Sequence, residues 1–169
     1  MFFNRQKTLC DDATVSLLFL RKIFQMITIH SKPDELNAIN KGSLMEQLGI
    51  EYLELKEGFV RGRMPVDSRT KQPMGILHGG ASLAFAETIA SLGSLALVDQ
   101  DKFEIRSASL TANHVGATTK GWVIGEATLI HRGKMTHVWD IEIKDEAGNK
   151  VSVARMTVIV IPKESQNIK

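Results

Sequence analysis

The chain has 169 residues, of which 43% are hydrophobic and 24% charged, as expected for one globular domain with a sizeable core. Its 21 basic and 19 acidic residues give a formal net charge of +2, and 6% of residues are aromatic, which argues against a nucleic-acid-binding protein. The single cysteine, Cys10, excludes an internal disulfide framework or a cysteine metal cage and favours a reducing, cytoplasmic setting. No apolar run reaches the roughly 20 residues of a membrane span.

An N-terminal arm is predicted over 1–30, ahead of one domain over 31–169. Asp11 and Asp12 precede a short apolar stretch in the arm, and no small-residue cleavage site follows, so a secretory signal is not expected. The arm is interpreted as a short amphipathic helix or a loosely ordered segment. Alternatively, translation starts at Met26 and the preceding residues are upstream sequence.

Helices and strands are predicted from hydrophobic periodicity and turn residues. In chain order these are a helix in pieces over 33–48, strands over 50–55 and 59–64, a long helix over 79–98, and strands over 103–114, 121–130, 135–144 and 151–161. A capping box is expected from Ser43 to Glu46, with a stop at Gly49. Because short turns favour antiparallel pairing, the last four strands are expected to form a meander in an α+β fold.

The long predicted helix carries the first candidate site residues. Apolar or small residues surround it on all sides, so we expect the sheet to enclose it. Glu87 is its only acid, and a buried carboxylate is costly unless paired, which favours a catalytic base or nucleophile. Ser91 lies four residues on, on the same face, where it can orient the carboxylate or a water molecule. The structural alternatives are a Glu87 paired or at the rim, and a Ser91 that only packs.

Two glycines, Gly79 and Gly80, stand at the predicted helix start, where unpaired N–H groups collect and a ligand can approach closely. Such a start can polarise a carbonyl. His78 and, more weakly, Gln72 are candidate donors to the same oxygen. A tight turn and a structural histidine are the alternatives. With Glu87, these groups suit hydrolysis of an activated acyl group such as a thioester.

Other catalytic motifs are absent from the sequence. It contains neither a zinc-hydrolase helix motif, nor a dinucleotide- or phosphate-binding glycine loop, nor a nucleophile elbow. Neither a metal nor a cofactor is therefore expected.

The pattern from Gln72 through His78-Gly-Gly to Glu87 and Ser91 closely resembles the hotdog-fold acyl-CoA thioesterases. It is most similar to the branch with 1,4-dihydroxy-2-naphthoyl-CoA thioesterase, the enterobactin-pathway proofreading thioesterase and one type of 4-hydroxybenzoyl-CoA thioesterase. Further similar stretches are 111–115, 137–143 and 145–148, within a likeness that runs from about Gly42 to Ile161.

The resemblance implies a hotdog fold, an antiparallel sheet wrapped around one long helix, paired into homodimers and usually homotetramers. It implies hydrolysis of an aromatic or medium-chain acyl-CoA, with 1,4-dihydroxy-2-naphthoyl-CoA of menaquinone biosynthesis as the first candidate. One alternative is a hotdog protein that binds acyl-CoA without turnover, for which a buried Glu87 has no use. Another is a hotdog dehydratase, which requires a histidine and a carboxylate on facing elements.

The resemblance also assigns roles to individual positions. Glu87 corresponds to the catalytic carboxylate, and Gly79 and Gly80 to the helix start whose amide polarises the thioester carbonyl. The other matching positions are His78 and Gln72 at the carbonyl, Ser91 at the water, and His114, Gly133 and Lys134 at the CoA nucleotide. Gly116 and Met135 stand where many relatives carry basic residues, so the hold on the CoA phosphates is expected to be rearranged.

The spacing within the long helix predicts a site shared between two chains. Gly80 and Glu87 are separated by roughly 10 Å along the axis, at about 1.5 Å per residue. One carbonyl cannot contact both groups at that separation. A two-fold partner with an antiparallel helix would place the Glu87 of one chain beside the Gly80 of the other.

Overall fold

A computed structural model describes residues 27–163 of the chain. Residues 1–26 of the predicted arm, with Cys10, and residues 164–169 lie outside the described part. Ile27 belongs to the predicted arm, yet it is only 4% exposed and packs in the core. No helix within 27–163 is long and apolar enough to cross a membrane.

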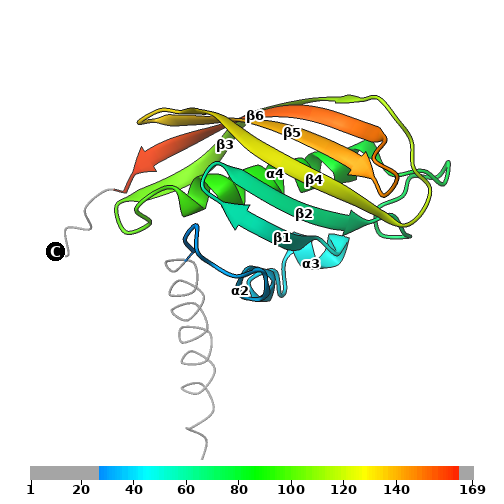
Figure 1. Cartoon of the computed structure of the whole chain (residues 1–169), viewed down its shortest axis with the longest axis horizontal. Helices are drawn as coiled ribbons and strands as arrows, with labels where there is room; N and C mark the ends of the chain where they lie inside the picture. Colours follow the sequence, from blue (N-terminus) through cyan, green and yellow to red (C-terminus); the bar gives the residue numbers. More distant parts are fainter. Residues whose placement is uncertain (1–26, 164–169) are drawn as a thin grey trace, which may run out of the picture.

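Six antiparallel strands form one sheet that curves over a long helix (Figure 1). The elements in chain order are α2 (Pro33–Ala38), α3 (Leu44–Leu48), β1 (Glu51–Lys56), β2 (Phe59–Pro65), α4 (Gly79–Ala96), β3 (Phe103–His114), β4 (Trp122–Arg132), β5 (Thr136–Asp145) and β6 (Lys150–Pro162). The short helices α2 and α3 lie at the β1 edge of the sheet (Figure 1). The predicted α+β class is confirmed.

The strand order β1-β2-β4-β5-β6-β3 differs from the predicted four-strand meander. β4 and β5, and β5 and β6, pair as expected, but β3 pairs with β6 at the far edge while β4 pairs with β2. The reason lies in the connection from β3 to β4. Thr118 accepts a hydrogen bond from Leu77, and Gly121 accepts one from Val66, so the connection follows the loop before α4 instead of turning back.

The predicted capping box of α3 does not form. The Ser43 hydroxyl donates to the Asn40 carbonyl, and the Glu46 carboxylate accepts from the Gly42 amide, one residue before the helix cap. The predicted stop is confirmed, because Gly49 caps the helix with φ of 67°, a left-handed conformation that suits glycine.

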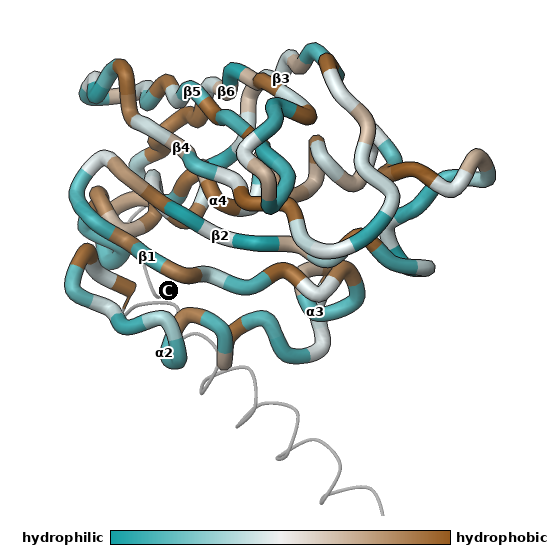
Figure 2. The backbone as a smooth tube through the Cα atoms, turned by 45° about the vertical axis from the view of Figure 1, so that its right-hand side comes forward, coloured by the Kyte–Doolittle hydropathy of each residue, from teal (hydrophilic) through white to brown (hydrophobic). Residues whose placement is uncertain are grey.

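Large side chains of the core pack against glycines where α4 meets the sheet. Gly62 and Gly125 are partners across β2 and β4, and an added Cβ at Gly125 would lie 2.7 Å from the Phe85 ring of α4. An added Cβ at Gly93 of α4 would lie 2.4 Å from the Trp139 ring. In Figure 2 hydrophobic residues recur along α4 and along the strands that pass over it. Because glycine has no side chain, the sheet can approach the helix closely at these positions.

Candidate active site

One face of α4 is open. The buried face carries residues such as Phe85 and Ile89, whereas Glu87 on the opposite face is exposed. The expectation that the sheet encloses the whole helix, and with it Glu87, is therefore wrong for the single chain. Small residues such as Ala84 and Ala86 are alike in hydropathy, so the sequence does not show which of them faces the sheet.

Glu87 and Ser91 line the same cleft, as their four-residue spacing predicts. The cleft has a volume of about 1460 Å³ and lies between the open face of α4, the start of β3 and the N-terminal helices. Its other walls are largely apolar and include Ile39, Met45, Tyr52, Leu95, Phe103 and Ile105. Burial raises the pKa of Tyr52, so its hydroxyl stays neutral.

Ser107 is a site residue that the sequence analysis missed. Its hydroxyl oxygen Oγ donates to Oε1 of Glu87 over 2.6 Å, from β3 to α4. Because the contact joins two elements far apart in the sequence, spacing within either element gives no sign of it.

The start of α4 is capped by His78. Nδ1 of the ring accepts a hydrogen bond of 2.8 Å from the Gly80 amide. Since Nδ1 is the acceptor, a neutral His78 carries its proton on Nε2, on a side chain that is exposed. The Gly80 amide is thereby occupied. Gly79, as the first helical residue, has an N–H for which the helix offers no acceptor.

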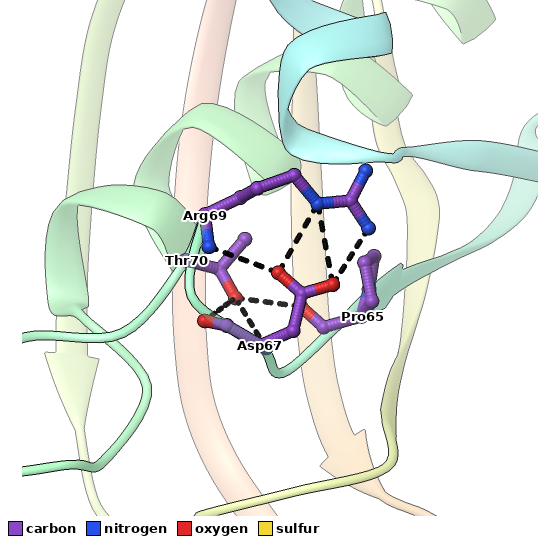
Figure 3. Close-up of polar contacts among 4 residues, drawn as sticks. All are labelled: Pro65, Asp67, Arg69 and Thr70. Carbon is purple, nitrogen blue, oxygen red and sulfur yellow. Dashed lines mark hydrogen bonds and ion pairs between the residues drawn. The ribbon is translucent and has the colours of Figure 1, made fainter.

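A braced loop carries Gln72 and His78 to the helix start. The buried Thr70 hydroxyl donates to the Pro65 carbonyl over 2.7 Å, and Asp67 binds the Arg69 side chain and backbone (Figure 3). The Thr70 carbonyl then accepts from the His78 amide over 2.8 Å. The loop therefore has a fixed route into α4.

Gln72 begins a turn within that loop. Its carbonyl accepts from the Gly75 amide, and its own amide donates to the Ile76 carbonyl. The Gln72 side chain is half-buried and does not line the cleft that holds Glu87.

The three residues assigned to CoA lie at opposite ends of α4. His114 covers the N-terminal end, because an added Cβ at Gly79 would lie 2.6 Å from its Nε2 atom. Gly133 and Lys134 belong to the hairpin between β4 and β5, next to Arg132, which donates to the Leu97 carbonyl at the C-terminal end. One chain does not bring them together.

The structure explains one of the two departures from the related pattern. An added Cβ at Gly116 would lie 2.3 Å from the Lys150 carbonyl oxygen, so this backbone has no room for a basic side chain. Met135 is 65% exposed in the hairpin beside Lys134, and nothing in the structure explains why it replaces a basic residue. Within 27–163 no group of acidic, histidine or cysteine side chains has the arrangement of a metal site.

Comparison with known proteins gives a consistent result. The thioesterase superfamily profile matches residues 74–152. The proofreading thioesterase EntH of Cronobacter turicensis is 39% identical over 78% of this chain and 96% of its own length. A solved variant of a thioesterase from Pseudomonas aeruginosa has a TM-score of 0.77 and 37% identity, covering 79% of this chain and 96% of the other.

A protein of Staphylococcus aureus is known as two alanine variants. One, in which a glutamate is replaced, has a TM-score of 0.70 over 71% of this chain and 99% of its own. The other, a thioesterase in which a glutamine is replaced, has a TM-score of 0.69 over 70% of this chain and 98% of its own. Both are 43% identical to this chain.

Proposed function

The chain belongs to the thioesterase superfamily, and from that premise we propose that it hydrolyses an acyl-CoA to the free acid and CoA with Glu87 as its central catalytic group. The hotdog fold expected from the sequence is shared with its solved relatives. The observation that carries the proposal is the position of Glu87. It is the only acid of α4, it projects from the open face, and it lines a large and mainly apolar cleft.

The chemistry requires a base and an electrophilic site. In the first form of the mechanism, Glu87 takes a proton from a water molecule, which attacks the thioester carbonyl carbon; the C–S bond then breaks and CoA leaves as the thiol. In the second, the Glu87 carboxylate attacks that carbon itself, the C–S bond breaks, and CoA leaves as the thiolate, which takes a proton from water. A water molecule then cleaves the resulting anhydride, which releases the acid and restores the carboxylate. Rapid quenching during single turnover separates the two, because only the second accumulates an acylated enzyme.

The carbonyl oxygen requires donors where negative charge develops. The Gly79 amide and the Nε2 proton of His78 are the donors that the helix start offers, since Gly80 already donates to His78. Gln72 enters by the same loop, and we propose that it assists at that oxygen. We propose that Ser91, which lines the same cleft as Glu87, holds the water.

We propose that the two halves of the site come from two chains of a homodimer. Gly79 and Glu87 lie eight positions apart on α4, or roughly 12 Å at about 1.5 Å per residue. A reacting carbonyl must contact both within about 3 Å. An antiparallel partner helix on the open face of α4 brings the Glu87 of one chain to the helix start of the other.

The same two-fold symmetry brings together the residues assigned to CoA binding. With antiparallel helices, the N-terminal end of one α4 faces the C-terminal end of the other, so His114 of one chain approaches Gly133 and Lys134 of its partner. Binding of the nucleotide would then also need two chains. A dimer of dimers in the cytoplasm remains the expected assembly.

We propose that the cleft binds an aromatic or medium-chain acyl group, because its walls are mostly apolar. Its volume of about 1460 Å³ in the single chain exceeds the roughly 300–1,000 Å³ of usual ligand pockets, so a partner helix can fill part of it. The proofreading thioesterase among the relatives has a name that specifies no acyl group. Aromatic acyl-CoAs, 1,4-dihydroxy-2-naphthoyl-CoA among them, and medium-chain acyl-CoAs therefore both belong in a substrate panel.

The variants of the Staphylococcus aureus protein support the assignment of Gln72 and Glu87. Its two substituted positions are a glutamine and, further along, a glutamate. They are separated by the same number of residues as Gln72 and Glu87 in this chain.

The proposal is tested with a panel of acyl-CoAs, aromatic and aliphatic, read by the release of free thiol. Glu87→Gln should fold normally and lower kcat by at least about 100-fold, the scale of losing a general base. Glu54→Gln is the matched control, since Glu54 lies on β1 outside the cleft and pairs with Lys56, and the activity of this variant should stay within about twofold. A Glu87→Gln variant that retains activity within a few-fold of wild type rejects the role of Glu87.

A further inference from the structure

We propose that Ser107 is a positioning residue for Glu87, an inference that rests on the proposed function. The Ser107 hydroxyl donates to Oε1 of Glu87 over 2.6 Å. No other side chain among residues 27–163 hydrogen-bonds this carboxylate, so the serine holds one oxygen and leaves Oε2 to act on water or the substrate. Ser107 itself does not take part in bond making.

A single irregularity of β3 follows directly after Ser107, which faces α4. Pairing with β6 runs from Ser107 opposite Val158 to Ser109 opposite Thr157, which leaves Ala108 without a partner. Such an extra residue is a β-bulge, and it reverses the alternation of side chains beyond it. Bulges of this kind re-aim side chains beside active sites.

The side chains on the two sides of the bulge show this reversal. Before it, Ser107 reaches Glu87 on α4. Beyond it, His114 contacts the start of α4, whereas Asn113 lines a hollow on the opposite face of the sheet. In a regular strand these faces would be exchanged beyond Ser107, and His114 would point away from the helix. One inserted residue therefore lets the same strand serve both the carboxylate and the helix start.

The hydrogen bond has one main consequence for Glu87. A glutamate side chain rotates about several bonds, and a fixed oxygen restricts it to the orientation that the reaction uses. The other charged groups of the cleft, Asp101, Lys102, Glu104 and Lys163, are the same in every variant below and do not account for a difference between them.

Ser107→Ala removes the donor with little change in volume. We expect kcat/KM to fall by about 10-fold, the scale for one hydrogen bond to a charged group. The loss should fall on kcat with KM within about twofold, since Ser107 holds Glu87 and does not itself line the cleft. A readout independent of turnover is the carboxyl ¹³C signal of Glu87, assigned by its absence in Glu87→Gln. At one fixed pH this signal should shift in Ser107→Ala, because one carboxylate oxygen loses its donor.

Two variants separate positioning from mere packing. Ser107→Thr keeps the hydroxyl and suits a strand, so it should restore both the rate and the position of the carboxyl signal. Ser109→Ala makes the same chemical change on β3 beyond the bulge, at a serine that is exposed, and should leave both unchanged. The oligomeric state of each variant is measured alongside, because β3 is an edge strand.

Ser107→Ala with wild-type rate and an unmoved carboxyl signal overturns the proposal, as does an equal effect of Ser109→Ala. Failure of the proposed function has a different signature, since Glu87→Gln would then itself remain active. If no acyl-CoA is hydrolysed, the carboxyl signal still decides whether Ser107 holds the Glu87 side chain.

Discussion

Mixing of two inactive variants tests whether the site is shared between chains. One variant is Glu87→Gln, and the other is Gly79→Val, which damages the helix start. An added Cβ at Gly79 would lie 2.6 Å from Nε2 of His114, so valine must displace that ring as well as obstruct the amide. Because the two residues are roughly 12 Å apart along α4, at about 1.5 Å per residue, each lesion leaves the other half of the site intact.

The expected recovery follows from counting sites. If the chains are unfolded together and refolded at equal amounts, about half of the dimers are hybrids by chance. In each hybrid, one site combines the intact helix start of one chain with the intact Glu87 of the other, while the second site carries both lesions. About a quarter of wild-type activity should return. With sites confined to one chain, every site carries one lesion and nothing returns.

In a complementary mixture, a shared site is expected to leave less activity than a site within one chain. The double variant Gly79→Val/Glu87→Gln is refolded with an equal amount of wild type. In the shared arrangement both sites of a hybrid are damaged, so about a quarter of the activity remains, whereas sites within one chain would retain about half. Thiol release from an acyl-CoA measures both mixtures, and tagged chains establish that hybrids form. Half recovery here, with none in the first mixture, refutes the shared site.

Two further predictions concern stability. Burial, assisted by the nearby Arg132 and His131, lowers the pKa of His137, so the unfolded chain binds more protons below its ordinary value of about 6.5. The free energy of unfolding should therefore fall as the pH drops through that value, and urea titrations from about pH 8 to about pH 5 should show less of this loss in His137→Leu. Gly93→Ala should destabilise by about 1–3 kcal/mol, since its Cβ would lie 2.4 Å from the Trp139 ring. Urea unfolding should show a smaller loss in a Trp139→Phe background, and an equal loss would contradict this account.

The sequence predicts the elements of this fold well because their signals are local. Neighbours within a few residues determine the alternation around Trp139, the turn at Gly49 and the long helix that ends at Ala96. The order of the strands in the sheet does not depend on such local signals. Pairing of β3 with β6 depends on contacts between the connection around Thr118 and the loop before α4, and no pattern within either strand encodes them.

For the site, too, local features could be predicted from the sequence and contacts between distant elements could not. The spacing of Glu87 and Ser91 on one helix face is a local property, and the structure bears it out. The serine that binds Glu87 was missed because its partner lies on a distant element and because the unpaired Ala108 after it reverses the alternation of side chains along the rest of β3, which strand periodicity does not reveal. The open face of α4 was missed for a different reason. Its small side chains are equally compatible with contact to the sheet and contact to a second chain.

Assembly and catalysis are linked in this arrangement by two adjacent surfaces. β3 is an edge strand whose side chains beyond Arg106 are mostly exposed, and an unprotected edge is a template for pairing with another chain. The open face of α4 lies beside it, since Glu87 of the helix binds Ser107 of the strand. A partner that covers one surface therefore also covers the other. If the partner brings its own helix start to Glu87, the event that protects the strand edge is also the event that completes the site.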